Sequence, residues 1–246
     1  MPSADCIIPT YTNEYWLKRC LRSLAEAKMP ELGRVFVVDN GGDYFAGNHF
    51  TLGLDVSVLN PGKNIGWTEG LRFALPHVKS EFVMFLNDDT EFERMPDRLS
   101  LLLEHFADPE VIAVGPGTGV AMGRQALAGP DIEPTRLLVG FCMVIRHSDL
   151  IAIGGVRGVP GDMELGDDVD FCIRANKAKK KMVIDRRVFV YHHAFKTGTR
   201  LYGSARKEDG WNSLTMVSGV VQKLILEHGV EAVLDTIGED GPTGGN

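Results

Sequence analysis

Three acidic side chains that lie close together in the sequence, Asp88, Asp89 and Glu91, are the first residues that could carry chemistry. They follow an apolar run without charges, Phe82 to Leu86. Neighbouring carboxylates repel one another unless a cation or a proton relieves them. Mg²⁺ and Mn²⁺ prefer such oxygen ligands and leave other positions to substrate phosphates. The cluster indicates a divalent-cation site for a phosphorylated substrate, although so short a pattern, taken alone, favours an ordinary turn rich in Asp and Asn.

A second acidic segment, Asp162 to Asp170, opens a predicted helix. The helix dipole favours acidic residues in the first turn, but it does not require five of them. If Asp168 points into the same crevice, it can remove a proton from an acceptor hydroxyl. Asp167, together with Glu164, is then expected to hold the acceptor, and Asp170 is expected to be structural.

Two adjacent histidines, His192 and His193, follow a predicted strand. A neutral imidazole there could complete the coordination shell of a cation, and a protonated one could bind phosphate. Adjacent residues of an extended chain face opposite ways, so at most one points into the site, and we favour His192. The other histidines are interpreted as surface residues: His49, His77, His105, His147 and His228.

The predicted strands of the first half bring polar residues to one edge of a sheet. These strands cover 6–8, 35–38, 56–59 and 82–86. Helical periodicity over 13–28 places an apolar face against them, and the alternation of strand and helix predicts an α/β fold with a parallel sheet. Three strand ends carry Asp39-Asn40-Gly41, Asn60-Pro61-Gly62 and Asn87-Asp88-Asp89. Because open α/β sheets bind ligands beyond the carboxyl ends of their strands, we expect these ends to share one crevice.

The second half is predicted from the same patterns. Helices are expected around 99–106, 166–178 and 211–228, and strands over 111–114, 137–145 and 188–191. Glycine and proline predict a flexible loop from Gly115 to Pro134, and the tail from Gly238 is expected to be disordered. The basic run between Lys177 and Arg187 is interpreted as a solvated helix end and a turn.

Bulk composition limits the function classes. The chain has 246 residues, 44% of them hydrophobic, and a net charge of −7. This charge disfavours nucleic-acid and anionic-lipid partners. The sequence contains no uninterrupted apolar stretch of about 18 residues, so no membrane span is predicted. The four scattered cysteines are expected to be reduced core residues. The protein is expected to be cytoplasmic, with peripheral attachment to the inner face of the membrane as an alternative.

A series of short motifs resembles the inverting nucleotide-diphospho-sugar glycosyltransferases of family 2. The early motifs are Ile7 to Tyr11, Cys20 to Leu24, Val37 to Gly41, Asn64 to Gly66, and Leu86 to Thr90. The later ones are Gly140 to Arg146, Gly154-Gly155, Asp167 to Arg174, and Val190 to His192. They span roughly residues 5 to 195 in the family's order, so chance is a poor explanation. Asn87 at the first position of the aspartate tip is similar to rhamnosyltransferase-like members.

The resemblance implies the GT-A fold, a Rossmann-like mixed sheet, mainly parallel, flanked by helices in one body that binds nucleotide and acceptor. It implies that Asp39 recognises the base edge, that Asp89 is the principal metal ligand with His192 beside it, and that Asp168 is the catalytic base. Thr10 joins Asp39 at the nucleoside. The remaining donor-binding residues that it implies are Pro9, Tyr11, Asn40, Asn64, Gly66, Arg72, Asn87 and Asp88.

The same resemblance divides the chain. Residues 1–115 are expected to bind the nucleotide sugar, residues 116–205 to bind the acceptor and catalyse, and residues 206–246 to form a helix and a tail. Two departures stand out. The segment from Trp67 to Arg72 replaces a run of small residues, so Arg72 either contacts the diphosphate or lies on a helix surface, and Asp167 replaces the usual glutamate.

The expected reaction is a metal-assisted, inverting sugar transfer with Mn²⁺ or Mg²⁺. The donor nucleoside stays open among UDP, dTDP and GDP, and the acceptor is a glycan or another hydroxyl compound, with proteins, small molecules and modified nucleic-acid bases as alternatives. A non-catalytic sugar-nucleotide or glycan-binding module is the main alternative function, and Asp89 together with Asp168 argues against it. A nucleotidyltransferase or a dinucleotide oxidoreductase would need a glycine-rich loop after the first strand, and this sequence lacks one. A glycoside hydrolase would not need a metal-binding strand end.

Overall fold

The computed structural model describes residues 3–41, 51–119, 125–158, 166–193 and 213–238, with side chains from 219 onward in the last range. One mixed sheet runs through this part in the order β3-β2-β1-β4-β8-β6-β9-β5, and β7 also pairs with β9. The strands are β1 (Ala4–Thr10), β2 (Leu32–Asp39), β3 (Val56–Leu59), β4 (Phe82–Leu86), β5 (Thr90–Phe92), β6 (Val111–Gly117), β7 (Ile132–Thr135), β8 (Cys142–Arg146) and β9 (Lys181–His192).

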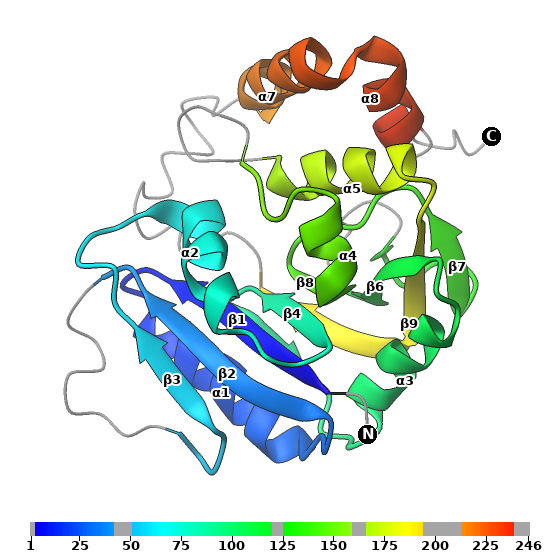
Figure 1. Ribbon diagram of the computed structural model, residues 1–246. Helices are drawn as coiled ribbons and strands as arrows, with labels where there is room; N and C mark the ends of the chain where they lie inside the picture. The colour runs from blue at the N-terminus through cyan, green and yellow to red at the C-terminus, as the bar shows by residue number, and fades with distance from the viewer. Residues whose placement is uncertain (1–2, 42–50, 120–124, 159–165, 194–212, 239–246) are drawn as a thin grey trace.

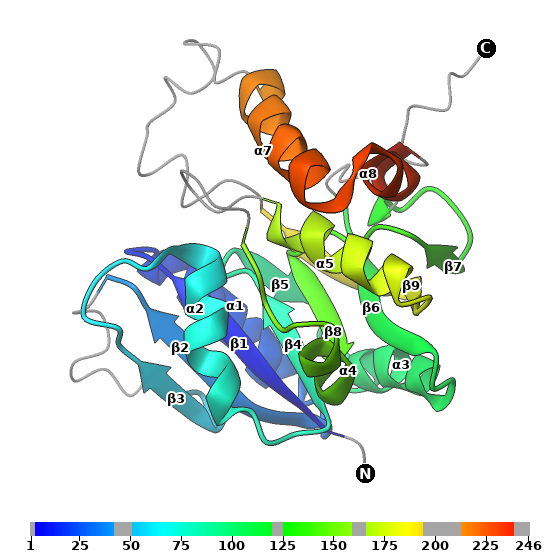
Figure 2. The same cartoon turned by 45° about the horizontal axis from the view of Figure 1, so that its top comes forward.

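Helices cover both faces of this sheet (Figure 1). They are α1 (Glu14–Ala27), α2 (Gly66–Ala74), α3 (Arg98–Glu104), α4 (His147–Ala152), α5 (Asp167–Lys177), α7 (Ser213–His228) and α8 (Val230–Ile237). One core contains side chains of α1 and α3, and the other contains side chains of α2, α4 and α5. The last two helices pack on α5, as Figure 2 shows.

The two-residue period of a strand explains this double core. Cys6 and Ile8 of β1 face the first core, whereas Ile7 between them faces the second. The continuous apolar run of β4 is buried at every position, as expected of a central strand with helices on both faces. β1 pairs in parallel with β2 and β4, so their carboxyl ends lie at one edge.

The second half departs from the sequence prediction in several places. β9 is a strand of 12 residues rather than the short 188–191 segment, and it contains Arg186, which was assigned to a turn. Arg186 is buried there because Glu133 pairs with its guanidinium at 2.7 Å. The predicted flexible loop from Gly115 contains the end of β6 and most of β7, whereas 120–124 lie outside the described residues. β8 begins at Cys142 rather than at 137, and β5 and α4 were missed.

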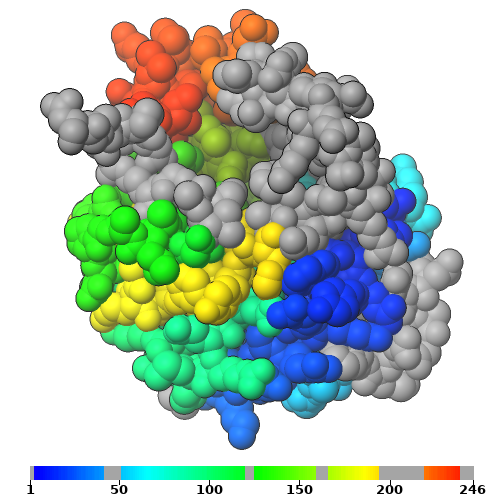
Figure 3. Space-filling model, turned by 180° about the vertical axis from the view of Figure 1, so that it is seen from behind, coloured from blue at the N-terminus to red at the C-terminus, as the bar shows by residue number. Residues whose placement is uncertain are grey.

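β9 reaches the surface beside the N-terminal part of the chain (Figure 3).

Candidate functional site

The ends of β1, β2 and β4 lie side by side, joined by strand pairing and by one side-chain hydrogen bond. Thr10 and Asp39 are register partners at the last positions of β1 and β2. The hydroxyl of Thr10 donates to Oδ2 of Asp88, directly after β4, at 2.7 Å. These three polar side chains are 2–6% exposed. Of the three predicted strand ends, the structure thus links those at Asp39 and Asp88 through Thr10 of β1.

The start of α2 adjoins this cluster. The Asn40 side chain donates to the carbonyl of Gly66 at 3.1 Å and accepts from the backbone N–H of Ile65 at 3.3 Å. Asn64 accepts from the N–H of Gly66 at 2.9 Å. Gly66 has φ = +80°, a left-handed conformation that favours glycine. These bonds fix the first turn of α2 against the end of β2.

His192 reaches the aspartate tip through the pairing of β5 with β9, which sets it opposite Thr90. Its Nε2 lies 3.0 Å from the amide nitrogen of Asn87 and 3.3 Å from a carboxylate oxygen of Asp89. Phe141 stacks on the imidazole, with 5.1 Å between ring centroids. Of the two adjacent histidines, His192 therefore contacts Asp89, the predicted principal metal ligand, as well as Asn87.

His193 has a different environment. Its Nε2 lies 2.6 Å from Glu91, and its ring packs on Trp16 with centroids 4.3 Å apart. Arg19 also pairs with Glu91, at 2.6 Å. Glu91 therefore pairs with His193 and with Arg19 of α1, rather than joining Asp89 and His192.

Burial dominates the electrostatics of the tip. It raises the pKa of Asp88 to about 7, and the charge of Asp89 adds to this, while the hydrogen bond from Thr10 opposes it. A cation near these carboxylates would favour their ionised forms.

Asp89 and His192 fit a divalent cation. A metal-binding imidazole nitrogen must offer a lone pair, and the single lone pair of Nε2 would reach a cation only if the Asn87 amide, 3.0 Å away, turned aside. The other ring nitrogen, Nδ1, is buried without a hydrogen-bond partner among the described residues. Two protein ligands leave most coordination positions to substrate oxygens, which is typical of Mg²⁺ and Mn²⁺.

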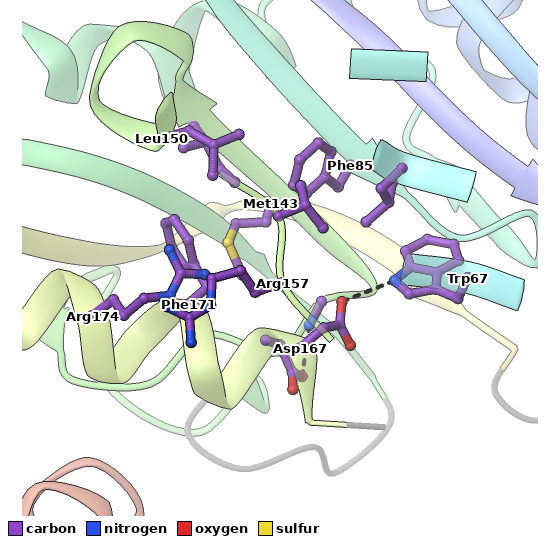
Figure 4. Close-up of a pocket in the computed structure, with 13 residues that line it drawn as sticks. Trp67, Phe85, Met143, Leu150, Arg157, Asp167, Phe171 and Arg174 are labelled. Atoms are coloured by element: carbon purple, nitrogen blue, oxygen red, sulfur yellow. Dashed lines mark hydrogen bonds between the residues drawn. The ribbon is translucent and has the colours of Figure 1, made fainter. Parts of the chain in front are cut away.

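Asp167 and Asp168, at the start of α5, form the second acidic site. Asp168 accepts from the backbone N–H groups of Gly140 at 3.1 Å and Val169 at 2.8 Å. Asp167 accepts from the indole nitrogen of Trp67 at 3.2 Å, as Figure 4 shows. Burial, followed by the charge of Asp168, raises the pKa of Asp167 to about 8. Burial also raises the pKa of Asp168, and its two backbone donors oppose the rise.

One backbone step connects the two acidic sites. Gly140, which donates to Asp168, precedes Phe141, which stacks on His192. The carbonyl of Phe141 also accepts from the N–H of Asn87 at 2.9 Å. The residues that enter β8 therefore hold the start of α5 and the aspartate tip in fixed relation.

Residues 5–150 match the family model of glycosyl transferase family 2. The chain belongs to this family. The chain is 28% identical over 207 residues to the pre-mycofactocin glycosyltransferases of two Mycobacterium tuberculosis strains, CDC 1551 and H37Rv. Those alignments cover 76% of this chain and 42% of each relative, so the chain spans less than half the length of these curated relatives.

Solved structures show the same fold. A Pyrobaculum calidifontis mannosyltransferase in complex with GDP-Man and Mn²⁺ has a TM-score of 0.63 at 17% identity, covering 100% of this chain and 76% of that one. GalNAc-T7 with UDP, GalNAc and Mn²⁺ has a TM-score of 0.65 at 12% identity, covering 78% and 44%. Staphylococcus aureus TarS has a TM-score of 0.60 at 18% identity, covering 77% and 36%. The predicted GT-A fold is confirmed.

The other predicted site residues of this family member lie in different settings. Pro9 is buried in β1, and Tyr11 follows that strand half-buried. Arg72 donates to the carbonyl of Val156 at 3.2 Å and pairs with Glu69, so its guanidinium ties α2 to a loop. Glu164 lies outside the described residues.

Two histidines that were interpreted as surface residues are instead paired in the interior. His105 contacts Asp185 and His228 contacts Asp170, each at 2.8 Å, and the two imidazoles are 12% and 5% exposed. Asp170 also pairs with Arg174 at 2.7 Å, in keeping with its expected structural role. Sequence reasoning missed these pairs because their partners are 58 or more positions apart.

Two further residues of the site were not predicted. Trp67 bonds Asp167, and Phe141 supports His192. The departure at Trp67 from the family's small-residue run was the available signal for the first.

Within the described residues, no helix is both long and apolar enough to cross a bilayer.

Proposed function

We propose that this member of glycosyl transferase family 2 moves a sugar from a nucleoside diphosphate to an acceptor hydroxyl, with inversion at the anomeric carbon. The donor lies against the ends of β1, β2 and β4, and Asp168 faces the acceptor. The observation that carries this proposal is the backbone step from Gly140, on Asp168, to Phe141, on His192. It supports a base and a leaving-group site at fixed positions around one reacting carbon, which a single in-line displacement needs.

The donor half would divide its contacts between nucleoside and diphosphate. Asp39, buried at the end of β2, accepts hydrogen bonds from the base edge, with Thr10 and Tyr11 beside it. The first turn of α2, fixed by Asn40 and Asn64, offers backbone N–H groups to phosphate oxygens. Uridine, deoxythymidine and guanosine can each satisfy an aspartate acceptor, so the nucleoside is left open among them.

Asp89 and His192 would hold a divalent cation, Mn²⁺ or Mg²⁺, with Asn87 and Asp88 in contact with ribose or diphosphate. When bound, such a cation neutralises the charge that develops on the departing diphosphate. Two structural neighbours, the mannosyltransferase and GalNAc-T7, are complexes with Mn²⁺ and a nucleotide or nucleotide sugar, which supports this choice.

Asp168 would act as the general base. Its carboxylate takes the proton of the acceptor hydroxyl while that oxygen bonds to the anomeric carbon, and the bond from this carbon to the diphosphate breaks with its electron pair going to the diphosphate. The two backbone donors on Asp168 favour its ionised form. Burial raises the pKa of both carboxyl groups, so we assign one shared proton to the pair near neutral pH. Asp167 binds the acceptor, with Glu164 assigned the same task.

The decisive experiment compares Asp168→Asn with the unmodified protein. Calorimetry with Mn²⁺ and a panel of UDP-, dTDP- and GDP-linked sugars gives donor affinity, and release of nucleoside diphosphate gives turnover. We expect unchanged donor affinity and a loss of turnover by a factor of about 10² to 10⁴. Asp55→Asn is the control, because the Asp55 side chain is 62% exposed just before β3 and pairs with Arg34.

Full turnover by Asp168→Asn would refute its role as the base. Binding of a donor without turnover by the unmodified protein, under every donor and acceptor condition, would instead favour a sugar-nucleotide-binding module.

A further inference from the structure

Aromatic side chains line the surface where β9 passes the start of α1. We call this set the aromatic strip: Tyr15, Trp16, Phe189, Tyr191 and His193. Phe189 and Tyr191 form an edge-to-face pair, with ring centroids 4.5 Å apart. His193 packs on Trp16 at 4.3 Å, and Trp16 meets Tyr15 edge to face at 5.1 Å. Figure 3 shows the N-terminal part of the chain beside β9 on this face of the molecule.

The period of β9 places these residues on one face of the strand. Phe189 and Tyr191 are two positions apart, so their side chains lie on the same face. The pairing of β5 with β9 sets Glu91 opposite Tyr191 on that face, and His193 continues the row through its contact with Glu91. His192, between these residues, contacts the aspartate tip instead. The aromatic strip therefore lies next to the candidate metal site, on the other face of β9.

The rings are accessible to a ligand, and the charges beside them cancel. Tyr15 is 62% exposed and Tyr191 is 55% exposed. The guanidinium of Arg19 lies 5.0 Å from the centroid of the Trp16 ring and 5.7 Å from that of Tyr15, and it pairs with Glu91 at 2.6 Å. Because Arg19 and Glu91 neutralise each other, the strip combines aromatic surface with hydrogen-bonding groups and has no net charge.

A pyranose ring matches these features. Its faces carry C–H groups and its edge carries hydroxyls, so an aromatic ring can cover one face while polar neighbours bond the hydroxyls. A surface without net charge does not attract phosphate polymers or anionic lipids. An apolar protein partner would have to bury the Arg19–Glu91 pair and remove its solvation, which is costly. Membership of glycosyl transferase family 2 also supports a carbohydrate ligand.

We propose that the aromatic strip is a second binding surface, outside the catalytic site, for a neutral oligosaccharide. The exposed rings of Tyr15 and Tyr191 stack on pyranose faces, and Arg19 and Glu91 bond the hydroxyls at the ring edges. The strip holds a glycan chain beside the candidate metal site. This inference goes beyond the proposed function, because binding at the strip needs neither nucleotide nor cation.

The test measures oligosaccharide binding without donor or metal. Ligand-observed NMR titrations of the unmodified protein use cellopentaose, mannopentaose and isomaltopentaose. We expect at least one of them to bind, and we expect Tyr15→Ala and Tyr191→Ala each to weaken it about three- to tenfold. Tyr191→Phe keeps the ring and should keep the affinity. Phe73→Ala, at an aromatic residue of α2 that is 41% exposed, is the control and should leave the affinity unchanged.

Three results would overturn the inference. The first is that none of the three pentasaccharides binds, or that both alanine variants bind as well as the unmodified protein. The second is an equal loss in Tyr191→Phe and Tyr191→Ala, since stacking would then not be the source of the affinity. The third is co-sedimentation with vesicles of phosphatidylcholine and phosphatidylglycerol that is lost in Tyr191→Ala, which would assign the strip to a membrane surface. Nucleoside diphosphates with Mn²⁺ are titrated separately, so failure of the proposed function and failure of this inference give different results.

Discussion

The indole nitrogen of Trp67 donates a hydrogen bond to Asp167, 3.2 Å away and 100 positions later in the chain. This bond joins the first turn of α2, at the predicted donor site, to the first turn of α5, at the predicted acceptor site. The same carboxyl shares its surroundings with Asp168, which takes its own donors from the backbone. Of these two neighbouring carboxyl groups, Asp167 therefore accepts from a side chain, and Asp168 accepts from the backbone.

Replacing Trp67 with Phe should raise the pKa of Asp167 above its present value of about 8. The aromatic ring is kept, but the bond that stabilises the ionised carboxylate is lost. We expect unchanged nucleotide binding and a higher apparent pKa in an NMR titration of the Asp167 carboxyl carbon. Trp16→Phe is the control, since Trp16 packs on His193 instead. An unshifted titration in Trp67→Phe would show that the bond is not formed in solution.

The raised pKa of Asp167 also predicts how stability depends on pH. Its folded-state pKa, about 8, lies above the ordinary value of 3.8, so the folded protein binds the extra proton between these limits. Stability from this group therefore decreases as the pH rises from about 4 to about 8 and is level above that. Asp167→Asn removes the titration. Its melting temperature should gain on that of the unmodified protein across this window, and a constant difference would contradict the prediction.

The sequence was most informative where local pattern and final position agree. The run Phe82 to Leu86 of β4 is apolar at every position, and a strand with helices on both faces requires that pattern. The polar residues at the ends of β2, β3 and β4 could be assigned to one edge because parallel strands end together. Thr10 and Asp88 do meet there.

Prediction failed where a distant partner decides the local structure. Arg186 and Arg187 interrupt the apolar pattern of β9, so only its last residues resembled a strand. Glu133 and Asp185 neutralise these arginines and allow the strand to continue through them. His228 is buried for the same reason, because Asp170 lies opposite it across the contact between α7 and α5. Such pairs have no signature in local periodicity.

Asp89→Ala should abolish metal-dependent binding of nucleoside diphosphates. The Asp89 carboxylate is 3.3 Å from Nε2 of His192, so its removal leaves the imidazole as the single strong ligand of that pair. Calorimetric titration of UDP, dTDP and GDP with and without Mn²⁺ measures the effect. Asp97→Asn, at a side chain 56% exposed before α3, is the control. A Mn²⁺ enhancement that survives in Asp89→Ala would assign the cation to other residues.

Thr10 and Asp88 should be coupled energetically. The hydroxyl of Thr10 is 2.7 Å from the Asp88 carboxylate, and both residues are buried. Thr10→Val keeps the shape of the side chain but leaves a buried carboxylate oxygen without its donor, which costs about 1–3 kcal/mol. In an Asp88→Asn background the same change should cost less, because the acceptor is no longer a carboxylate. Urea denaturation of the four proteins of this double-mutant cycle measures the coupling, which we expect to be about 0.5–3 kcal/mol. Additive losses would mean that the two strand ends are held together by backbone pairing rather than by this side-chain bond.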